Sequence, residues 1–248
     1  MKIASKTDVG LKREENQDRE WVGRLDNDAV LAVICDGMGG ANAGSTASEI
    51  AISEFTYRVK AGFTKTDRPN FLKNLMITSI EAANTVVYQK STTDETLQGM
   101  GTTCVAAIIS EKAAYIINVG DSRAYLIRGG EIYRITEDHT VVSQWVAEGK
   151  ITEDEANEHP QRNIITRAVG VSPKVTADYY ELDVEQDDIL LLCSDGLSSY
   201  CNMVESLDII NSAENLQDAA NSLVEYAIAQ GGTDNITVTL ISNEAGDI

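Results

Sequence analysis

The chain has 248 residues, enough for one large domain or two small ones with a sizeable core. Its hydrophobic content of 43% is typical of a globular protein and argues against disorder. The formal net charge of −19 repels phosphate backbones and anionic lipid, so we expect neither nucleic acid nor a membrane as a partner. The N-terminus lacks a signal-peptide apolar region, and no segment approaches the roughly 20 apolar residues of a membrane-spanning helix.

Four cysteines are present, at positions 35, 104, 193 and 201, and none forms a CxxC pair. This spacing argues against zinc and redox motifs. The first three lie in apolar segments, where a free cysteine acts as a small core side chain. The pattern therefore indicates a reducing compartment and predicts a cytoplasmic protein.

The first part of the chain predicts three strands followed by two helices. A charged loop at 10–18 and a turn at 26–28 separate the strands. Apolar residues at helical spacing predict both helices, with Asn70 as the N-cap of the second, and the two should pack as an antiparallel pair. The strands are expected at about 1–9, 20–24 and 30–40, and the helices at about 45–58 and 70–89.

The remainder of the chain is mainly β in pattern, with a polar helical insert at about 140–161 that could cover one side of a site. Turn residues at 111–112 and 128–131 predict hairpins. The order of elements favours α+β layers over a doubly wound fold. We expect strands at about 102–110, 113–119, 123–127, 132–135, 175–182, 188–193 and 235–241, and a helix at about 216–229.

Two apolar strands each end in an Asp-Gly step. Val30 to Ile34 leads through Cys35 to Asp36-Gly37, and Ile189 to Leu192 leads to Asp195-Gly196. A buried strand does not tolerate an unpaired charge at its end, so each carboxylate needs a partner. We expect the two aspartates to meet at a shared cation.

Five aspartates occupy similar settings at chain reversals. A single such residue is usually a turn or cap residue, but five at strand ends in one layered domain indicate a metal site. Oxygen-only ligands select Mg²⁺ or Mn²⁺, and two such ions roughly 3.5–4 Å apart activate a water and clamp a phosphoryl group. The residues are Asp18, Asp36, Asp121, Asp195 and Asp234.

A phosphate substrate also needs a positive group. Arg13, in the loop leading to Asp18, is the best candidate, because guanidinium binds phosphate with two hydrogen bonds. Arg123 follows Asp121 closely, and we expect it to form a structural ion pair. Neither of the two histidines, His139 and His159, lies in one of these turns, so we expect surface or structural roles for both.

Other motifs fail on their spacing. Gly37-Met38-Gly39 follows a strand, but Asn42 stands where a dinucleotide-binding loop needs its third glycine, and two helices follow instead of a βαβ unit. Asp26-Asn27-Asp28 lacks the glycine and the spacing of an EF-hand loop.

Taken together, the motifs resemble those of the metal-dependent protein phosphatases of the 2C type, in their compact bacterial form. The similarity covers nearly the whole chain, and the joint order of the motifs is specific. They are Arg13-x-x-Asn16-Gln17-Asp18, Asp36-Gly37-Met38-Gly39-Gly40, Gly99-Met100-Gly101-Thr102-Thr103, Val119-Gly120-Asp121-Ser122-Arg123, Ser194-Asp195-Gly196-Leu197 and Gly232-Thr233-Asp234-Asn235-Ile236-Thr237.

The resemblance implies a single domain over 1–248 with a four-layer α-β-β-α sandwich, two antiparallel sheets flanked by antiparallel helix pairs. A flap at about 142–169 would lie beside the site and bear on substrate choice. The implied reaction is hydrolysis of phosphoserine and phosphothreonine on proteins, opposing a bacterial serine/threonine kinase. Phosphorylated proteins, including that kinase, would be the partners, and nothing in the sequence demands more than a monomer.

The resemblance also implies roles for the site residues. Asp36 would bridge two Mn²⁺ or Mg²⁺ ions, with the Gly37 carbonyl on one of them. Asp195 and Asp234 would complete the other, and Asp121 would belong to a third, weaker ion. The remaining two site residues would act on water and substrate: Asp18 would hydrogen-bond metal-bound waters, and Arg13 would hold the phosphate.

Two residues depart from the eukaryotic pattern. Met38 stands where those members often carry a histidine that serves as general acid, and Gln17 stands where they often carry an acidic residue. Both are normal for the bacterial branch. Because Met38 cannot donate a proton, the leaving group would be protonated by metal-bound water or another group.

Two alternatives stay open. The chain could be a non-catalytic sensor or scaffold with the same fold, although such proteins usually lose the metal aspartates or the arginine. It could also be another two-metal phosphoesterase, acting on small molecules or nucleic acid, although the negative charge disfavours a nuclease.

Overall fold

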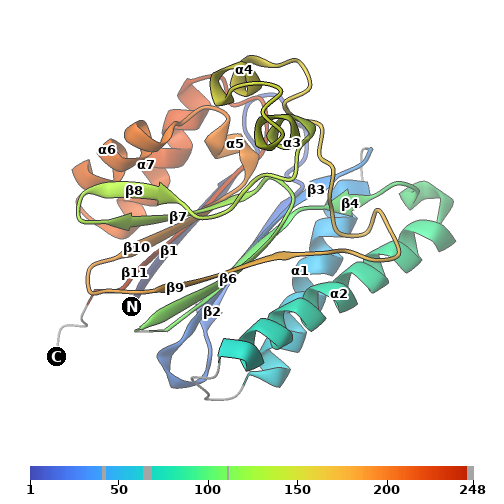
Figure 1. The fold of residues 1–248 in the computed structure, drawn as a ribbon, viewed down its shortest axis with the longest axis horizontal. Helices are drawn as coiled ribbons and strands as arrows, with labels where there is room; N and C mark the ends of the chain where they lie inside the picture. Colours follow the sequence, from blue (N-terminus) through green and yellow to red (C-terminus); the bar gives the residue numbers. More distant parts are fainter. Residues whose placement is uncertain (41–42, 64–68, 111, 245–248) are drawn as a thin grey trace.

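Two antiparallel sheets stack face to face, and helices cover the outer face of each (Figure 1). The computed structural model describes residues 1–40, 43–63, 69–110 and 112–244. All neighbouring strands in both sheets run antiparallel. The predicted four-layer α-β-β-α architecture is confirmed.

The first sheet joins strands from both ends of the chain, in the order β1-β11-β10-β7-β8. The last strand lies between the first strand and β10, with Lys2 opposite Ser242 and Ile189 also opposite Ser242. Its strands are β1 (Lys2–Asp8), β7 (Arg123–Arg128), β8 (Glu131–Arg134), β10 (Ile189–Cys193) and β11 (Ile236–Ser242).

The second sheet has the order β2-β3-β5-β6-β9, and the short β4 (Gly101–Thr102) pairs with the end of β3. The predicted strand 102–110 is divided at Thr103 into β4 and β5. The other strands are β2 (Asp18–Arg24), β3 (Val30–Met38), β5 (Cys104–Ile109), β6 (Ala113–Val119) and β9 (Asp178–Asp183).

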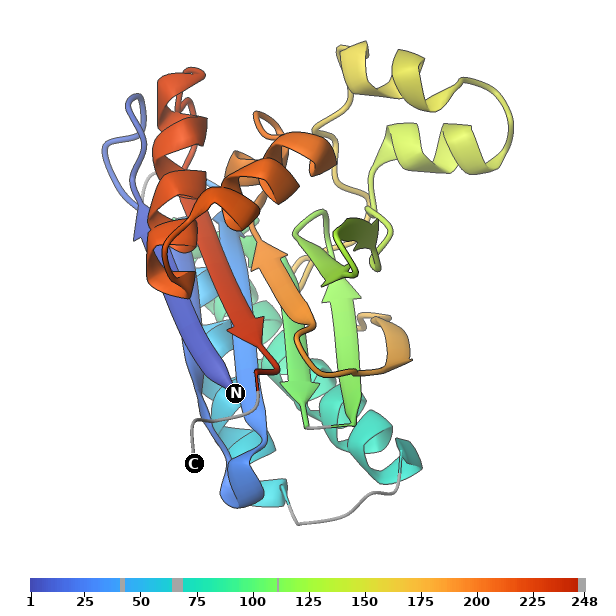
Figure 2. The same cartoon turned by 90° about the vertical axis from the view of Figure 1, so that its left-hand side faces the viewer.

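Helices α1 (Ala43–Gly62) and α2 (Pro69–Thr93) cover the second sheet, and α6 (Met203–Ser212) and α7 (Leu216–Ala229) cover the first. The short α5 (Asp195–Ser198) directly follows β10. Helices α3 (Val141–Ala147) and α4 (Glu153–Glu158) extend beyond one end of the sandwich (Figure 2). Two 3₁₀ turns, at Asp26–Asp28 and Glu95–Leu97, complete the elements.

Alternate side chains of β3 belong to different cores, as strand geometry requires. Leu31, Val33 and Cys35 pack beneath α1 and α2, whereas the residues between them face the opposite sheet. Val30, Ala32 and Ile34 are fully buried in this inter-sheet core. Asp36 is the next residue of that row, which explains why a carboxylate is found at the end of an apolar layer.

Element boundaries differ from prediction where local signals compete. Helix α2 begins at Pro69, so Asn70 is inside the helix and not its N-cap, because proline fits the first helical position. Helices α5 and α6 were not predicted, although Asn202 and Glu205 form a capping box at the start of α6. The predicted turn residue Glu111 lies outside the described residues. Across the described helices, none is long and apolar enough to span a bilayer.

Candidate active site

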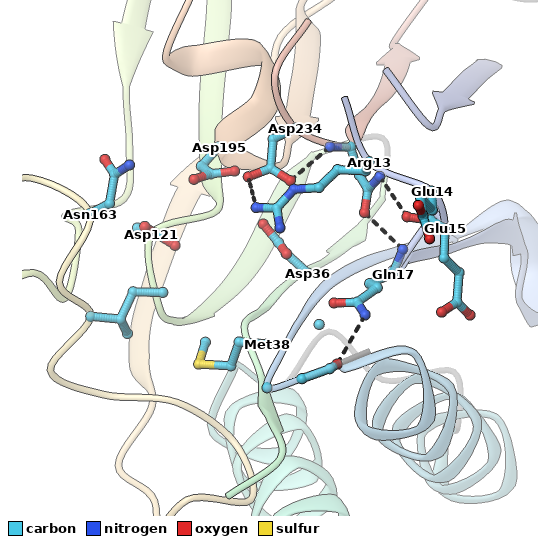
Figure 3. A pocket seen from close by; sticks show the side chains of 15 residues that line it. Arg13, Glu14, Glu15, Gln17, Asp36, Met38, Asp121, Asn163, Asp195 and Asp234 are labelled. Carbon is cyan, nitrogen blue, oxygen red and sulfur yellow. Dashed lines mark hydrogen bonds and ion pairs between the residues drawn. The ribbon is translucent and has the colours of Figure 1, made fainter. Parts of the chain in front are cut away.

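Strand ends from both sheets converge on an open cavity of about 820 Å³. Figure 2 shows the loop after β1, the end of β10 and the start of β11 at the same end of the sandwich as α3 and α4. Figure 3 shows the carboxylates gathered around the Arg13 guanidinium. The side chains labelled there as lining the cavity are Arg13, Glu14, Glu15, Gln17, Asp36, Met38, Asp121, Asn163, Asp195 and Asp234.

Asp36 is held at the end of β3 by hydroxyl groups of the neighbouring β4–β5 segment. Its N–H donates to Thr103 Oγ1 at 2.9 Å, and its carbonyl accepts from Thr102 Oγ1 at 2.8 Å. Thr103 Oγ1 also lies 2.7 Å from Ser122 Oγ, next to Asp121. Burial and then the charges of Asp18 and the other aspartates raise the pKa of Asp36 well above its usual range.

Asp18 is buried, with 3% of its surface exposed. Its Oδ2 accepts hydrogen bonds from Ser194 Oγ and Thr237 Oγ1, both at 2.7 Å, while Oδ1 has no partner in the described part of the chain. Burial raises the pKa of Asp18 to about 7, although the two hydroxyl donors act in the opposite direction. The free oxygen is therefore an acceptor that a proton, a water or a cation could satisfy.

Asp121 and Asp195 repeat this situation. The Oδ1 atom of each is buried and has no hydrogen-bond partner within the described ranges. Burial raises the pKa of Asp121 to about 8, and burial with the charge of Asp234 raises that of Asp195 to about 6. Buried carboxylate oxygens without partners are rare in folded proteins and indicate an ion or water at this position.

Asp234 and Arg13 form an ion pair, with Nη2 to Oδ2 at 2.8 Å. Asn235, the next residue, holds the loop that carries Arg13: its Nδ2 donates to the carbonyls of Val9 and Glu15, both at 3.0 Å. Its Oδ1 accepts from the N–H of Gln17 at 2.8 Å. Both ends of the chain are thereby tied together at the site.

Two glycines allow the backbone to approach closely at the Asp-Gly steps. A Cβ on Gly37 would lie 2.2 Å from the carbonyl oxygen of Gly44, and one on Gly196 would lie 2.0 Å from that of Asn235. Either contact would force neighbouring segments apart. The glycines are therefore required by packing beside Asp36 and Asp195.

The carboxylates fit a hard cation in their chemistry. Among the described residues, no group of three or more His, Cys, Asp or Glu side chains forms a preformed metal cage. Mg²⁺, however, usually keeps several waters and takes only one or two carboxylates. The buried oxygens of Asp18, Asp121 and Asp195 that lack partners in the described part of the chain are the donor set that such an ion would neutralise, and their pKa values are raised first by burial and then by neighbouring aspartates.

The structure therefore brings together all five predicted aspartates, Gly37 and Arg13. Arg123 makes the expected structural ion pair, with Nη2 2.7 Å from Asp138 Oδ2. Sequence reasoning missed a set of polar side chains that orient the aspartates. Each lies within one of the six motifs or directly beside a site aspartate, which was the available signal. They are Thr102, Thr103, Ser122, Ser194, Asn235 and Thr237.

Comparisons with known proteins give the same family. The sequence profile of the family described as protein phosphatase 2C matches residues 12–235. Protein phosphatase PhpP of Streptococcus pneumoniae is 40% identical over 250 residues, covering 100% of this chain and 99% of that protein. Serine/threonine phosphatase stp of Listeria monocytogenes serotype 4b is 36% identical, covering 96% of this chain and 94% of that protein.

Solved structures of similar proteins give the same family as the sequence comparisons. The serine/threonine phosphatase Stp1 from Staphylococcus aureus superposes with a TM-score of 0.92 at 35% identity, covering 98% of this chain and 95% of that one. The catalytic domain of the serine threonine protein phosphatase PstP was solved in complex with two manganese ions. It superposes with a TM-score of 0.82 at 32% identity, covering 96% of each chain.

The chain belongs to the protein phosphatase 2C family. The predicted enzyme class, a serine/threonine protein phosphatase, is confirmed by this membership.

Proposed function

We propose that this phosphatase uses two Mn²⁺ or Mg²⁺ ions held by Asp36, the Gly37 carbonyl, Asp195 and Asp234. The observation that carries this assignment is the group of carboxylates that line the cavity, together with the buried oxygens of Asp18, Asp121 and Asp195 that lack partners among the described residues. The two manganese ions of the PstP structure support it. When bound, such an ion pair supplies an activated water and neutralises charge on the phosphoryl group. A third ion, at Asp121, is part of the proposal.

The chain's own side chains have separate tasks in this proposal. Arg13, 55% exposed, can leave Asp234 and bind the phosphate of a phosphoserine or phosphothreonine with two parallel hydrogen bonds. Asp18 Oδ1 is the acceptor that orients water, because Ser194 and Thr237 already satisfy Oδ2. Met38 lines the cavity and cannot donate a proton to the leaving oxygen. A donor from solvent would therefore protonate that oxygen.

The remaining parts of the proposal concern organisation and setting. All 248 residues would form one domain, with 142–169 as a flap; Asn163 and Ile165 line the cavity from that segment. We propose a monomer acting in the cytoplasm on phosphorylated proteins, among them a cognate serine/threonine kinase. The four buried free cysteines support a reducing compartment.

A phosphopeptide assay tests the assignment. Hydrolysis should require Mn²⁺ and should stop with chelator or with Asp36→Ala, while Arg13→Ala should raise KM and leave the melting temperature unchanged. The matched control is Lys12→Ala, in the same loop. Activity that persisted in chelator and in Asp36→Ala would exclude the two-metal mechanism.

Two further measurements address the alternatives. Titration calorimetry that detected no Mn²⁺ binding would favour a non-catalytic role. Faster turnover of nucleotides than of phosphopeptides would favour a different phosphoesterase.

A further inference from the structure

His139 is joined to Gly120, the residue before Asp121, by two hydrogen bonds. The N–H of His139 donates to the Gly120 carbonyl at 3.0 Å, and the N–H of Gly120 donates to His139 Nδ1, also at 3.0 Å. Gly120 adopts a φ of +111°, and a Cβ there would lie 2.6 Å from Thr103 Cγ2. The backbone that presents Asp121 is therefore fixed on both sides.

The other ring nitrogen is also occupied. Because Nδ1 accepts a hydrogen bond, the ring proton of the neutral form is on Nε2, which donates to Asp178 Oδ2 at 3.1 Å. Asp178 Oδ1 in turn accepts from Arg167 Nη1 at 2.6 Å, and the same Nη1 lies 2.9 Å from His139 Nε2. Burial lowers the pKa of His139, which favours this neutral form. The imidazole is thus held in one orientation by contacts at both ring nitrogens.

The same residue begins the segment that leads to the flap. Its carbonyl accepts from the N–H of Thr166 at 2.7 Å, and the next paired positions are Thr140 with Ile165. These contacts close the base of the segment that carries Asn163, which lines the cavity beside Asp121 (Figure 3). One buried side chain and its backbone therefore contact both the Asp121 turn and the base of the flap.

We propose that His139 is a positioning residue that sets the place of the Asp121 carboxylate and links it to the base of the flap. The proposal rests on the proposed role of Asp121 in binding a cation. Burial alone requires both ring nitrogens to be paired, but it does not require that one of them be bonded to the backbone next to Asp121. The link acts through Gly120, whose N–H and carbonyl are both hydrogen-bonded to His139.

Two amide variants separate the contacts of the ring. In His139→Asn the side-chain oxygen can take the place of Nδ1 and keep the hydrogen bond from the Gly120 N–H. In His139→Gln the side-chain amide reaches the place of Nε2 and keeps the hydrogen bond to Asp178. The first readout is hydrogen exchange of the Gly120 amide in metal-free protein. Protection should persist in His139→Asn and be lost in His139→Gln. Equal protection in both variants would overturn the proposal.

The second readout is the affinity for Mn²⁺, measured by calorimetry. His139→Gln should weaken the weakest Mn²⁺ site by about 10- to 100-fold, as loss of a group supporting a ligand does, and His139→Asn should weaken it less. Adding His139→Gln to Asp121→Asn should cause no further loss, because both act on one site. Equal loss of melting temperature in both variants with unchanged Mn²⁺ affinity would show a merely structural role.

His159 supplies the control. It lies in the helical insert that follows His139, where its ring centroid is 5.1 Å from that of Trp145 and its Nδ1 accepts from the N–H of Gln161. His159→Gln should leave both readouts unchanged. If the unsubstituted protein bound no Mn²⁺, the proposed function would fail, while the exchange of the Gly120 amide would still decide whether His139 fixes this turn.

Discussion

Asp18 and Asp36 occupy directly opposed positions on β2 and β3. Opposed residues of an antiparallel pair project from the same face, and like charges placed there repel. Asp36 also ends the buried row formed by Val30, Ala32 and Ile34. This end of the sandwich is therefore built at a cost in stability that a cation would offset.

Removing one of these charges should stabilise the metal-free protein and inactivate the enzyme. For Asp36→Asn we expect a gain of about 1–3 kcal/mol in the free energy of unfolding in chelator, because a buried, repelled carboxylate becomes neutral. Turnover of a phosphopeptide should fall by on the order of 100-fold or more if Asp36 bridges the ions. Urea unfolding and the phosphopeptide assay measure the two effects.

The control is Asp28→Asn, since Asp28 is 84% exposed in the first 3₁₀ turn. It should change neither quantity. A less stable Asp36→Asn protein in chelator would contradict the repulsion described here.

Thr237→Val tests the hydroxyl donors of Asp18. The change deletes the 2.7 Å hydrogen bond to Oδ2, which favours the ionised carboxylate, so the pKa of Asp18 should rise above about 7. The cost in stability should be about 1 kcal/mol. Carbon-13 titration of the Asp18 carboxyl in metal-free protein measures the pKa directly.

Thr239→Val is the matched control on the same strand, because Thr239 Oγ1 donates to Glu20 instead. Thr239→Val should leave the pKa of Asp18 unchanged. A pKa of Asp18 that fell in Thr237→Val would show that this hydroxyl does not stabilise the charged form.

The stability of the metal-free protein should depend on pH. The pKa values of Asp18, Asp121 and Asp195, about 7, 8 and 6, all exceed the ordinary value of 3.8. Between these limits the folded chain binds more protons than the unfolded chain, so the stability present at low pH is lost as the pH rises. The melting temperature in chelator should therefore be lower at pH 8 than at pH 6.

Mn²⁺ should reverse this loss at pH 8. A ligand at 100 times its dissociation constant adds about 2.7 kcal/mol to the stability of the form that binds it. A melting temperature that rose from pH 6 to pH 8 in chelator would refute the raised pKa values.

In Gly196→Ala the added methyl group should push the Asp195 turn away from the segment that carries Asp234. The new Cβ would lie 2.0 Å from the Asn235 carbonyl oxygen, a contact with backbone that no rotamer change relieves. We expect a loss of about 2 kcal/mol or more in unfolding free energy and weaker Mn²⁺ binding.

Gly62→Ala is the comparison for this glycine. Its Cβ would meet Leu75 Cδ1, the flexible end of a side chain, so the cost should be small. Equal stability of the two variants would show that the Gly196 contact relaxes freely.

The strands and the site aspartates could be predicted from sequence because their signals are local, whereas the four-layer sandwich was implied by the resemblance of the motifs to a known family. Apolar runs such as Val30 to Cys35 identify strands, and an aspartate beside glycine at a strand end identifies a turn. Asn235 could not be assigned in this way, since its partners Val9 and Glu15 are 226 and 220 residues away in sequence. Thr103, the single residue between β4 and β5, likewise has a distant partner, because its hydroxyl accepts from the N–H of Asp36, 67 residues away in sequence.

His139 shows the same limit. In the sequence it lies in none of the aspartate turns, and a surface or structural role was expected on that ground. Its two contacts become meaningful only when Gly120 and Asp178 are brought to the same place. The spacing of these residues in the sequence does not indicate that they are in contact in the folded chain.

The position of β11 between β1 and β10 has a consequence for synthesis of the protein. Residues 2–8 leave the ribosome well before their neighbour in the sheet, residues 236–242, which is translated more than two hundred residues later. Until then the loop that carries Arg13 has neither Asp234 nor Asn235 to hold it. A nascent chain therefore cannot form these contacts of the Arg13 loop until the segment from Asp234 to Ser242 has emerged.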